Sequence, residues 1–110
     1  MSDTIKDAHA EDFVGPIVTR GEISDAVAEA AAIDNEGRKL RLGENSGYVR
    51  VEVQGECVIR FKTVSEVLGR DFSVTDLERN MPGFSGLIRV DADQVRFLAS
   101  KKKPAAAAAK

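Results

Sequence analysis

Apolar and polar residues alternate along several short runs of the chain, and this two-residue period predicts β-strands. In the run 48–53, three valines share one face, and the polar residues between them, Glu52 included, share the other. The run 39–42 alternates in the same way. A further strand is predicted over Val14–Thr19. Because proline cannot donate to a strand ladder, Pro16 predicts that this strand lies at a sheet edge or starts near this residue.

The residues around Gly55 allow two arrangements of the strands that flank them. Cys57 and Ile59 form the apolar side of the second strand. A three-residue loop with Gly55 in a left-handed bulge would pair Val51 with Cys57 and place both apolar sets on one face, so we expect this hairpin. If the two strands do not pair directly, they must belong to two different sheets.

Helical spacing replaces alternation between residues 22 and 33. The apolar residues that recur at this spacing are Ile23, Ala26, Val27, Ala30 and Ile33. They predict an amphipathic helix over Glu22–Ile33, with an alanine-rich face that allows close approach to a sheet. The run 34–37 contains residues that tolerate left-handed backbone, and it is expected to end the helix.

Two shorter helices are predicted from the signals at their ends. A capping box predicts that the first begins after Thr63, and Gly69 ends it. A weaker capping box predicts that the second begins after Ser73. Pro82 then prevents this helix from continuing beyond Met81.

The last predicted elements are two strands joined by a turn at residues 91–93. Their apolar residues, expected to share one face, are Phe84, Ile88, Val90, Val95 and Phe97. The predicted order is therefore βαββ followed by βααββ, and segregated antiparallel strands with three short helices make an α+β domain. We assign this domain to residues 13–99, between a flexible N-terminal tail (1–12) and a flexible Lys/Ala-rich C-terminal tail (100–110).

Composition limits the function classes. The 110 residues suit a single domain, and no apolar run approaches the ~20 residues of a membrane span. The start of the chain lacks the pattern of a secretory signal, and a lone cysteine fits a reducing compartment, so we expect a cytoplasmic protein. A net charge of −2 argues against nucleic-acid binding, and we read the lysines of the C-terminal tail as solubilising.

Few residues are candidates for bond-making chemistry. The single histidine, His9, lies in the N-terminal tail, where nothing positions it as a general base. Cys57 is on the apolar side of a strand, where a thiol usually acts as a small core residue. Asp91 and Asp93 suit a turn better than a calcium site. We therefore expect a protein that is not an enzyme and carries no metal or cofactor.

Two features point instead to contact with another protein. In the loop from Arg79 to Gly86, Met81 and Phe84 flank a stiff Pro82-Gly83 turn. These apolar side chains either fill the core or dock on a partner, and the sequence does not separate the two readings. The second feature is a set of arginines, a residue enriched in interfaces, although solvated sheet faces explain most of them. They are Arg20, Arg38, Arg41, Arg50, Arg60, Arg70, Arg79, Arg89 and Arg96.

The order and spacing of several short motifs resemble a known family. The motifs are Val14-Gly15-Pro16-Ile17, Gly21-Glu22, Asp34-Asn35, Tyr48-Val49-Arg50-Val51, Gly55-Glu56-Cys57-Val58-Ile59-Arg60, Leu68-Gly69-Arg70-Asp71-Phe72, Met81-Pro82-Gly83-Phe84-Ser85-Gly86 and Asp93-Gln94-Val95-Arg96-Phe97. Together they resemble the effector, or coupling, proteins of bacterial multicomponent diiron monooxygenases. The short tails are most similar to the toluene, alkene and isoprene branch, and the C-terminal tail has no counterpart in the family.

This resemblance implies a fold with two small antiparallel sheets and a protein without a cofactor of its own. It implies that the protein, monomeric when free, binds a hydroxylase component above its diiron centre and modulates substrate access, oxygen activation and coupling. A Rieske-type ferredoxin and a flavin reductase are expected among the partner components. The partner-binding residues that the family motifs suggest are Asp34, Asn35, Arg79, Asn80, Met81, Pro82, Phe84 and Ser85. The alternative function is a small-molecule-sensing or adaptor domain.

Overall fold

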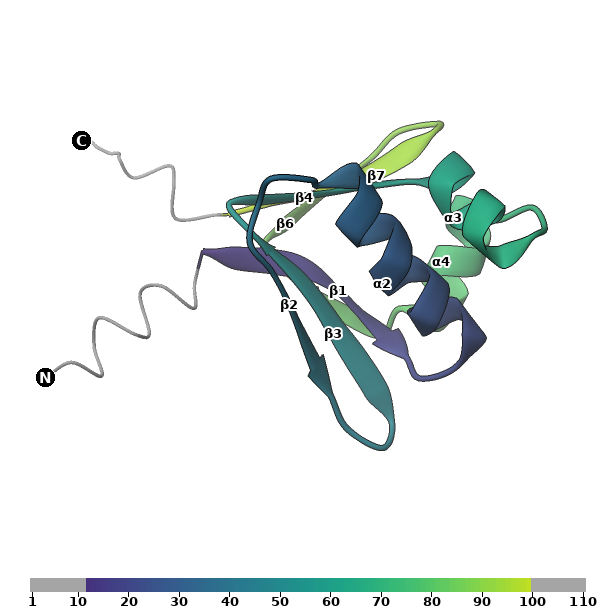
Figure 1. Ribbon diagram of the computed structural model, residues 1–110, viewed down its shortest axis with the longest axis horizontal. Coiled ribbons are helices and arrows are strands. Elements are labelled where there is room, and N and C mark those ends of the chain that lie inside the picture. The colour runs from purple at the N-terminus through teal and green to yellow at the C-terminus, as the bar shows by residue number, and fades with distance from the viewer. Residues whose placement is uncertain (1–11, 100–110) are drawn as a thin grey trace, which may run out of the picture.

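The computed structural model describes residues 12–99, which form three helices and two antiparallel sheets (Figure 1). In chain order the elements are β1 (Phe13–Thr19), α2 (Glu22–Asp34), β2 (Leu40–Glu44), β3 (Tyr48–Gln54), β4 (Glu56–Arg60), α3 (Phe61–Leu68), α4 (Val74–Asn80), β5 (Gly83–Ser85), β6 (Leu87–Val90) and β7 (Gln94–Leu98). The predicted α+β class is confirmed. The expectations for His9 and for residues 1–11 and 100–110 lie outside the described residues.

The first sheet has the strand order β2-β3-β1-β5, and the second has the order β4-β7-β6. In Figure 1 the two sheets converge where the described chain begins and ends, and they diverge toward the three helices. Hydrogen bonds hold the converging end together: the N–H of Gly55 donates to the carbonyl oxygen of Asp12 at 2.7 Å, and the N–H of Ala99 donates to that of Gly55 at 3.3 Å. Asp12, expected in the flexible tail, is thus bonded to the domain.

The expected hairpin around Gly55 is wrong, and the alternative with two sheets is correct. Gly55 does adopt a left-handed backbone, with φ of 86°, but it marks the passage of the chain from one sheet to the other. β3 already has β2 and β1 as neighbours, and β4 pairs with β7. The two strands bring their apolar sides into the same core without sharing a ladder, since Val51, Val53, Cys57 and Ile59 are all buried.

Pro16 does not lie at a sheet edge, because β1 runs between β3 and β5. The pairing of β1 with β3 explains how a proline fits an inner strand. Val14 pairs with Val53 and Ile17 with Arg50, but the ladder has no pair at Gly15 or Pro16. The missing N–H therefore falls in a local gap of that ladder. On its other side, Pro16 faces Phe84 of the short strand β5.

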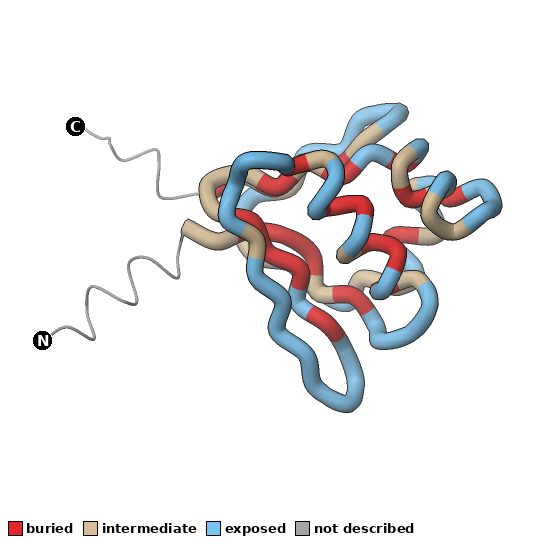
Figure 2. The backbone as a smooth tube through the Cα atoms, viewed as in Figure 1, coloured by how far each residue is buried: buried red, intermediate tan, exposed pale blue. Residues whose placement is uncertain are grey.

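α2 supplies the helical part of the core, and it packs on β1, β3, β4 and α3. Its buried apolar residues are Ala26, Val27, Ala30 and Ala31, so the alanine-rich face is confirmed (Figure 2). Ile33 was expected on this face, but it is 55% exposed. The buried stripe runs through Ala26, Val27, Ala30 and Ala31 and does not continue to Ile33, because in the last turns Ala31 and not Ile33 faces the core.

The helix ends follow the predicted signals in all but one case. α3 begins at Phe61, two residues before Thr63, so the prediction that Thr63 caps this helix is wrong. The predicted end at Gly69 is confirmed, with φ of 81°. In α4, the N–H of Ser73 donates to a carboxylate oxygen of Asp76 at 3.0 Å, which confirms the second capping box.

The predicted strand through Phe84, Ile88 and Val90 is broken in two at Gly86. This glycine has φ of 96°, and it separates β5 of the first sheet from β6 of the second. A Cβ atom at this position would lie 2.5 Å from the carbonyl oxygen of Leu98, so the chain passes close to β7 here. Ile88 pairs with Phe97 and Val90 with Val95, which puts these four residues on one face of the second sheet as expected, whereas Phe84 belongs to the other sheet.

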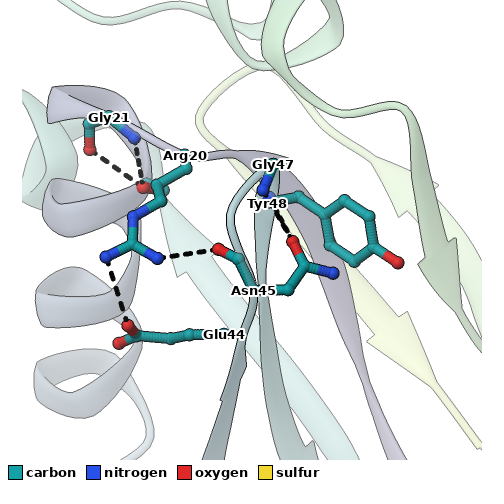
Figure 3. A network of polar contacts seen from close by, with 7 residues as sticks. Arg20, Gly21, Glu44, Asn45, Gly47 and Tyr48 are labelled. Carbon is teal, nitrogen blue, oxygen red and sulfur yellow. Dashed lines mark hydrogen bonds and ion pairs between the residues drawn. The ribbon is translucent and has the colours of Figure 1, made fainter.

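The hairpin between β2 and β3 is tied to the start of α2 by Arg20 (Figure 3). Its guanidinium donates to the carbonyl oxygen of Asn45 at 2.7 Å and lies 3.8 Å from a carboxylate oxygen of Glu44. The side-chain oxygen of Asn45 accepts the N–H groups of Gly47 and Tyr48, both at 2.8 Å. These bonds fix the turn and hold its tip beside the β1–α2 connection.

Candidate functional site

The eight residues suggested as partner-binding fall into two groups that contact different elements. Asp34 and Asn35 stand at the C-terminal end of α2 and bond to β4 and α3. The other six lie between the end of α4 and the end of β5, in residues 79–85, which we call the α4–β5 segment. The contacts of the α4–β5 segment are with α4 itself, β1, β3 and β7.

Asn35 is 5% exposed and makes three hydrogen bonds through its side chain. Its amide nitrogen donates to the carbonyl oxygens of Ala31 at 2.8 Å and Val58 at 2.7 Å, and its oxygen accepts the N–H of Val58 at 2.9 Å. β4 is an edge strand, so this side chain satisfies backbone groups that no neighbouring strand reaches. Asn35 therefore locks α2 onto the second sheet.

Asp34 performs a similar task one residue earlier. Its carboxylate accepts the N–H of Arg60 at 2.8 Å and the hydroxyl of Thr63 at 2.9 Å. These bonds join the end of α2 to the junction of β4 and α3. The two side chains thus already have partners inside the domain, and their direct contact with another protein stays a prediction.

The α4–β5 segment is the more accessible group. Pro82 and Arg79 are exposed, Met81 is half-buried against the core, and Phe84 is 40% exposed. The Phe84 ring packs on Phe97, with 5.8 Å between centroids, so one side of it is core and the other faces outward. A stiff turn that presents apolar and cationic side chains suits docking on another protein.

Asn80 and Ser85 fix the two ends of this segment. The amide nitrogen of Asn80 donates to the carbonyl oxygen of Asp76 at 2.8 Å, within the last turn of α4. The hydroxyl of Ser85 donates to a carboxylate oxygen of Glu52 at 3.1 Å. Because both ends are held, little backbone freedom is left to lose on association.

Glu52 is the residue that the sequence pattern misplaced. It was expected on a polar, solvated face of β3, but it is 5% exposed. Arg41 approaches one of its carboxylate oxygens at 3.0 Å, and Arg50 lies 3.9 Å from the other. The Arg41 guanidinium also stacks over the Phe13 ring at 4.1 Å. Opposite charges on neighbouring strands, Arg41 facing Glu52, were the signal available in the sequence.

Gly15 lets β1 approach the backbone of β3 closely, beside the bond between Ser85 and Glu52. It lies on β1, between the strands of these two residues, pairs with Ser85, and comes close to the backbone of Glu52 without a ladder pair there. Its φ is 152°, and a Cβ atom there would overlap the carbonyl oxygen of Val51. The hydroxyl of Ser85 on β5 reaches across β1 to the carboxylate of Glu52 on β3. The α4–β5 segment is thereby coupled to the first sheet.

Six of the nine arginines noted in the sequence form ion pairs: Arg20, Arg38, Arg41, Arg50, Arg70 and Arg96. Within residues 12–99, Arg60, Arg79 and Arg89 form no ion pair through their side chains. Unpaired arginines on a surface are free to meet carboxylates of a partner at no cost of breaking an internal pair. Arg79 is the one of these three that belongs to the α4–β5 segment.

The thiol of Cys57 and possible metal-binding groups were the other candidates for chemistry, and the structure describes both within residues 12–99. Burial, followed by the negative charges of Asp34 and Glu56, raises the pKa of the Cys57 thiol to about 12, so the reactive thiolate is disfavoured. Among residues 12–99 no group of three or more histidine, cysteine or acidic side chains is arranged to hold a metal ion. In the same range no helix is long and apolar enough to cross a membrane.

Comparison with known proteins places the chain in a family. The sequence profile of the MmoB/DmpM family matches residues 12–98, almost the whole described domain. The chain belongs to the MmoB/DmpM family. A relative from Xanthobacter autotrophicus (strain ATCC BAA-1158 / Py2), the effector subunit of an alkene monooxygenase system, is 30% identical over 97 residues, which cover 88% of this chain and 96% of that protein. The resemblance seen in the sequence motifs is confirmed, and the chain is a regulatory and not a catalytic component.

Solved structures agree at the level of the fold. A chain in the structure of the phenol hydroxylase–regulatory protein complex matches with a TM-score of 0.66 and 23% identity, over 78% of this chain and 95% of that one. The soluble methane monooxygenase regulatory protein B matches with a TM-score of 0.64 and 15% identity, over 87% of this chain and 71% of that one. The architecture of two sheets and three helices is therefore shared with regulatory proteins of this kind.

Proposed function

We propose that this protein binds the hydroxylase component of a multicomponent monooxygenase and tunes its reaction with substrate and oxygen. The observation that carries the proposal is the 30% identity, over nearly the full length of both chains, to the effector subunit of an alkene monooxygenase system. The same membership in the MmoB/DmpM family favours this function over a small-molecule sensor or a general adaptor.

The mode of action follows from what a protein without catalytic residues can do. A regulatory protein shifts its partner between two states only if it binds one state more tightly than the other. We propose that the favoured hydroxylase state is the one that admits substrate and couples electron transfer to hydrocarbon hydroxylation or epoxidation. The carboxylate-bridged diiron centre belongs to that hydroxylase, and a Rieske-type ferredoxin and a flavin reductase deliver electrons from NADH. The lone buried cysteine suits a working site in the cytoplasm.

We propose the α4–β5 segment as the main docking surface. It offers the unpaired cation of Arg79, the half-buried Met81 and the exposed edge of Phe84 around the rigid Pro82 turn. Aromatic, methionine and arginine side chains are the types enriched at interfaces, and a turn held at both ends limits the entropy lost on binding.

Substitutions in the segment test this surface. Met81→Ala and Arg79→Ala should each raise the concentration of this protein that is needed to stimulate the hydroxylase, by about 10-fold. A shift of this size is expected when an interface residue contributes more than ~1 kcal/mol. Thermal stability should change little for Arg79→Ala, because its side chain has no ion pair within residues 12–99. Phe84→Ala is a poorer test, since its ring also packs on Phe97.

The control is Glu44→Lys at the end of β2, which the proposal leaves outside the interface. Stimulation is measured as product formed by a fixed amount of hydroxylase at increasing concentrations of each variant. If the two segment variants titrate like the wild-type protein while Glu44→Lys does not, the docking surface lies on another face.

A further inference from the structure

A groove between α2 and α3 belongs neither to the core nor to the α4–β5 segment. One hollow of about 420 Å³ is lined by residues that include Glu29, Ile33 and Val67. A second hollow of about 180 Å³ is lined in part by Asp25, and it shares Glu29 and Val67 with the first. The two hollows therefore adjoin each other between the two helices, and together we call them the α2–α3 groove.

The floor of the α2–α3 groove is apolar. Val67 and Leu68 of α3 are half-buried there, and Ala26 of α2 lies between the helices. Ile33 stands at one end and is 55% exposed, the highest exposure among the large apolar side chains of residues 12–99. A single exposed isoleucine is ordinary on a protein surface, but here it borders a hollow with a second apolar wall. An apolar side chain inserted beside Ile33 and Val67 would bury both.

The rim of the groove is acidic. Glu22, Asp25, Glu29 and Glu66 line it, and Arg70 holds only Glu22, through hydrogen bonds of 3.0 and 3.3 Å. The other three carboxylates form no ion pair within residues 12–99, even though Lys62 lies one helical turn before Glu66. Carboxylates of one sign along a groove concentrate a negative potential that selects a cationic partner.

We propose that the α2–α3 groove binds a basic, partly apolar segment of the hydroxylase component. An apolar side chain of that segment packs between Ile33 and Val67, and its lysine or arginine side chains meet Asp25, Glu29 and Glu66. This is the mode in which an amphipathic segment lays its apolar side into a groove. In Figure 1, α2 and α3 lie side by side on the part of the domain away from the two chain ends. The inference rests on the proposed function.

The test compares the affinity of full-length variants for the purified hydroxylase. The double substitution Glu29→Lys/Glu66→Lys should raise the Kd at least 10-fold, and Ile33→Ser should raise it about 3- to 10-fold. Glu36→Lys is the matched control, because this exposed residue follows α2 and does not line the groove, and its Kd should stay within 2-fold of wild type. Circular dichroism melting of each variant separates lost binding from lost folding.

The possible outcomes are distinct. If the wild-type protein binds the hydroxylase and both groove variants bind equally well, the groove inference is wrong while the proposed function stands. If the wild-type protein does not bind at all, the proposed function itself fails. Removal of residues 100–110 that shifts the NMR signals of α2 and α3 would show that the chain's own lysines occupy the groove, which overturns the inference. Self-association abolished by Glu29→Lys/Glu66→Lys would overturn it in favour of a second copy.

Discussion

Single side chains hold the ends of elements together in this domain, and Asn35 is the clearest case. One amide group satisfies the backbone of Val58 on an edge strand and also the last turn of α2. An exposed asparagine such as Asn45 makes comparable bonds in a turn, but water can replace them there. Burial therefore decides how much the hydrogen bonds of each of these two asparagines contribute to the free energy of unfolding.

We predict that Asn35→Ala lowers the free energy of unfolding by about 3 kcal/mol, because it leaves buried backbone groups without partners. The matched variant Asn45→Ala should cost less than ~1 kcal/mol, since its bonds are exposed. Urea denaturation of both variants measures the difference. Equal losses would mean that the amide of Asn35 adds nothing beyond an ordinary surface bond.

Cys57 predicts a dependence of stability on pH. The thiol has its pKa raised from 9.0 to about 12 in the folded protein, so it keeps its proton there between these values, while the unfolded chain releases it. Stability should therefore fall as pH rises above 9, by about 1.4 kcal/mol per pH unit until about pH 12. Below pH 9 both states are protonated, and this contribution is constant.

Urea denaturation from pH 8 to 11 tests this, with Cys57→Ala as the reference. The variant should lose about 1 kcal/mol at pH 8 through a small cavity, and it should lack the thiol's share of the slope. Parallel pH profiles for the two proteins would show that the thiol does not titrate as its burial implies.

At the scale of elements, strand and helix positions were largely predictable from the sequence, but the neighbours of each strand were not. Alternation located β3 because its valines are buried on one side, whereas nothing local indicated that β4 joins another sheet. The Gly55 signal was read correctly as a left-handed turn and wrongly as a hairpin. Pairing partners are set by long-range packing, which short patterns do not encode.

The candidate site was predictable to a different degree in each part. Pro82 and Met81 marked the end of α4, and the structure places this turn near the surface as the breakers suggested. The link from Ser85 to Glu52 was not foreseeable, because it depends on two strands that both pair with β1. For Glu52, the sequence offered one signal of a charged partner, which was Arg41 on the neighbouring strand.

Gly15 is the point at which that arrangement should be most sensitive. Gly15→Ala should lower the free energy of unfolding by about 3 kcal/mol, because it combines an unfavourable φ of 152° with overlap against Val51. Gly21→Ala is a matched control, since its φ is 153° and no atom lies within 4 Å of the added Cβ. The control should show only the backbone part of the loss. Thermal unfolding that ranks Gly21→Ala as the worse variant would contradict the crowding at β1.

At the scale of the whole molecule, the first and the last described residues lie at the same end of the domain. In Figure 1 both termini of the described chain leave from the end where the sheets converge, away from the helices. We propose that residues 1–11 and 100–110 are not needed for folding, as their sequences join no apolar pattern. A chain shortened at both ends should keep its melting temperature within about 3 °C, given the ~4–8 °C expected per kcal/mol for a domain of this size. A much lower value would show that one tail belongs to the fold.

The central claim, that this protein acts by binding a hydroxylase and changing its reaction, is tested most directly by reconstitution. Purified hydroxylase, ferredoxin and reductase are supplied with NADH, oxygen and hydrocarbon, and the product formed per NADH consumed is measured with and without this protein. The account predicts that product per NADH and the product rate both rise as the protein is added and level off when it saturates the hydroxylase. A hydroxylase whose product rate and product per NADH are identical at every concentration of the protein would contradict the account.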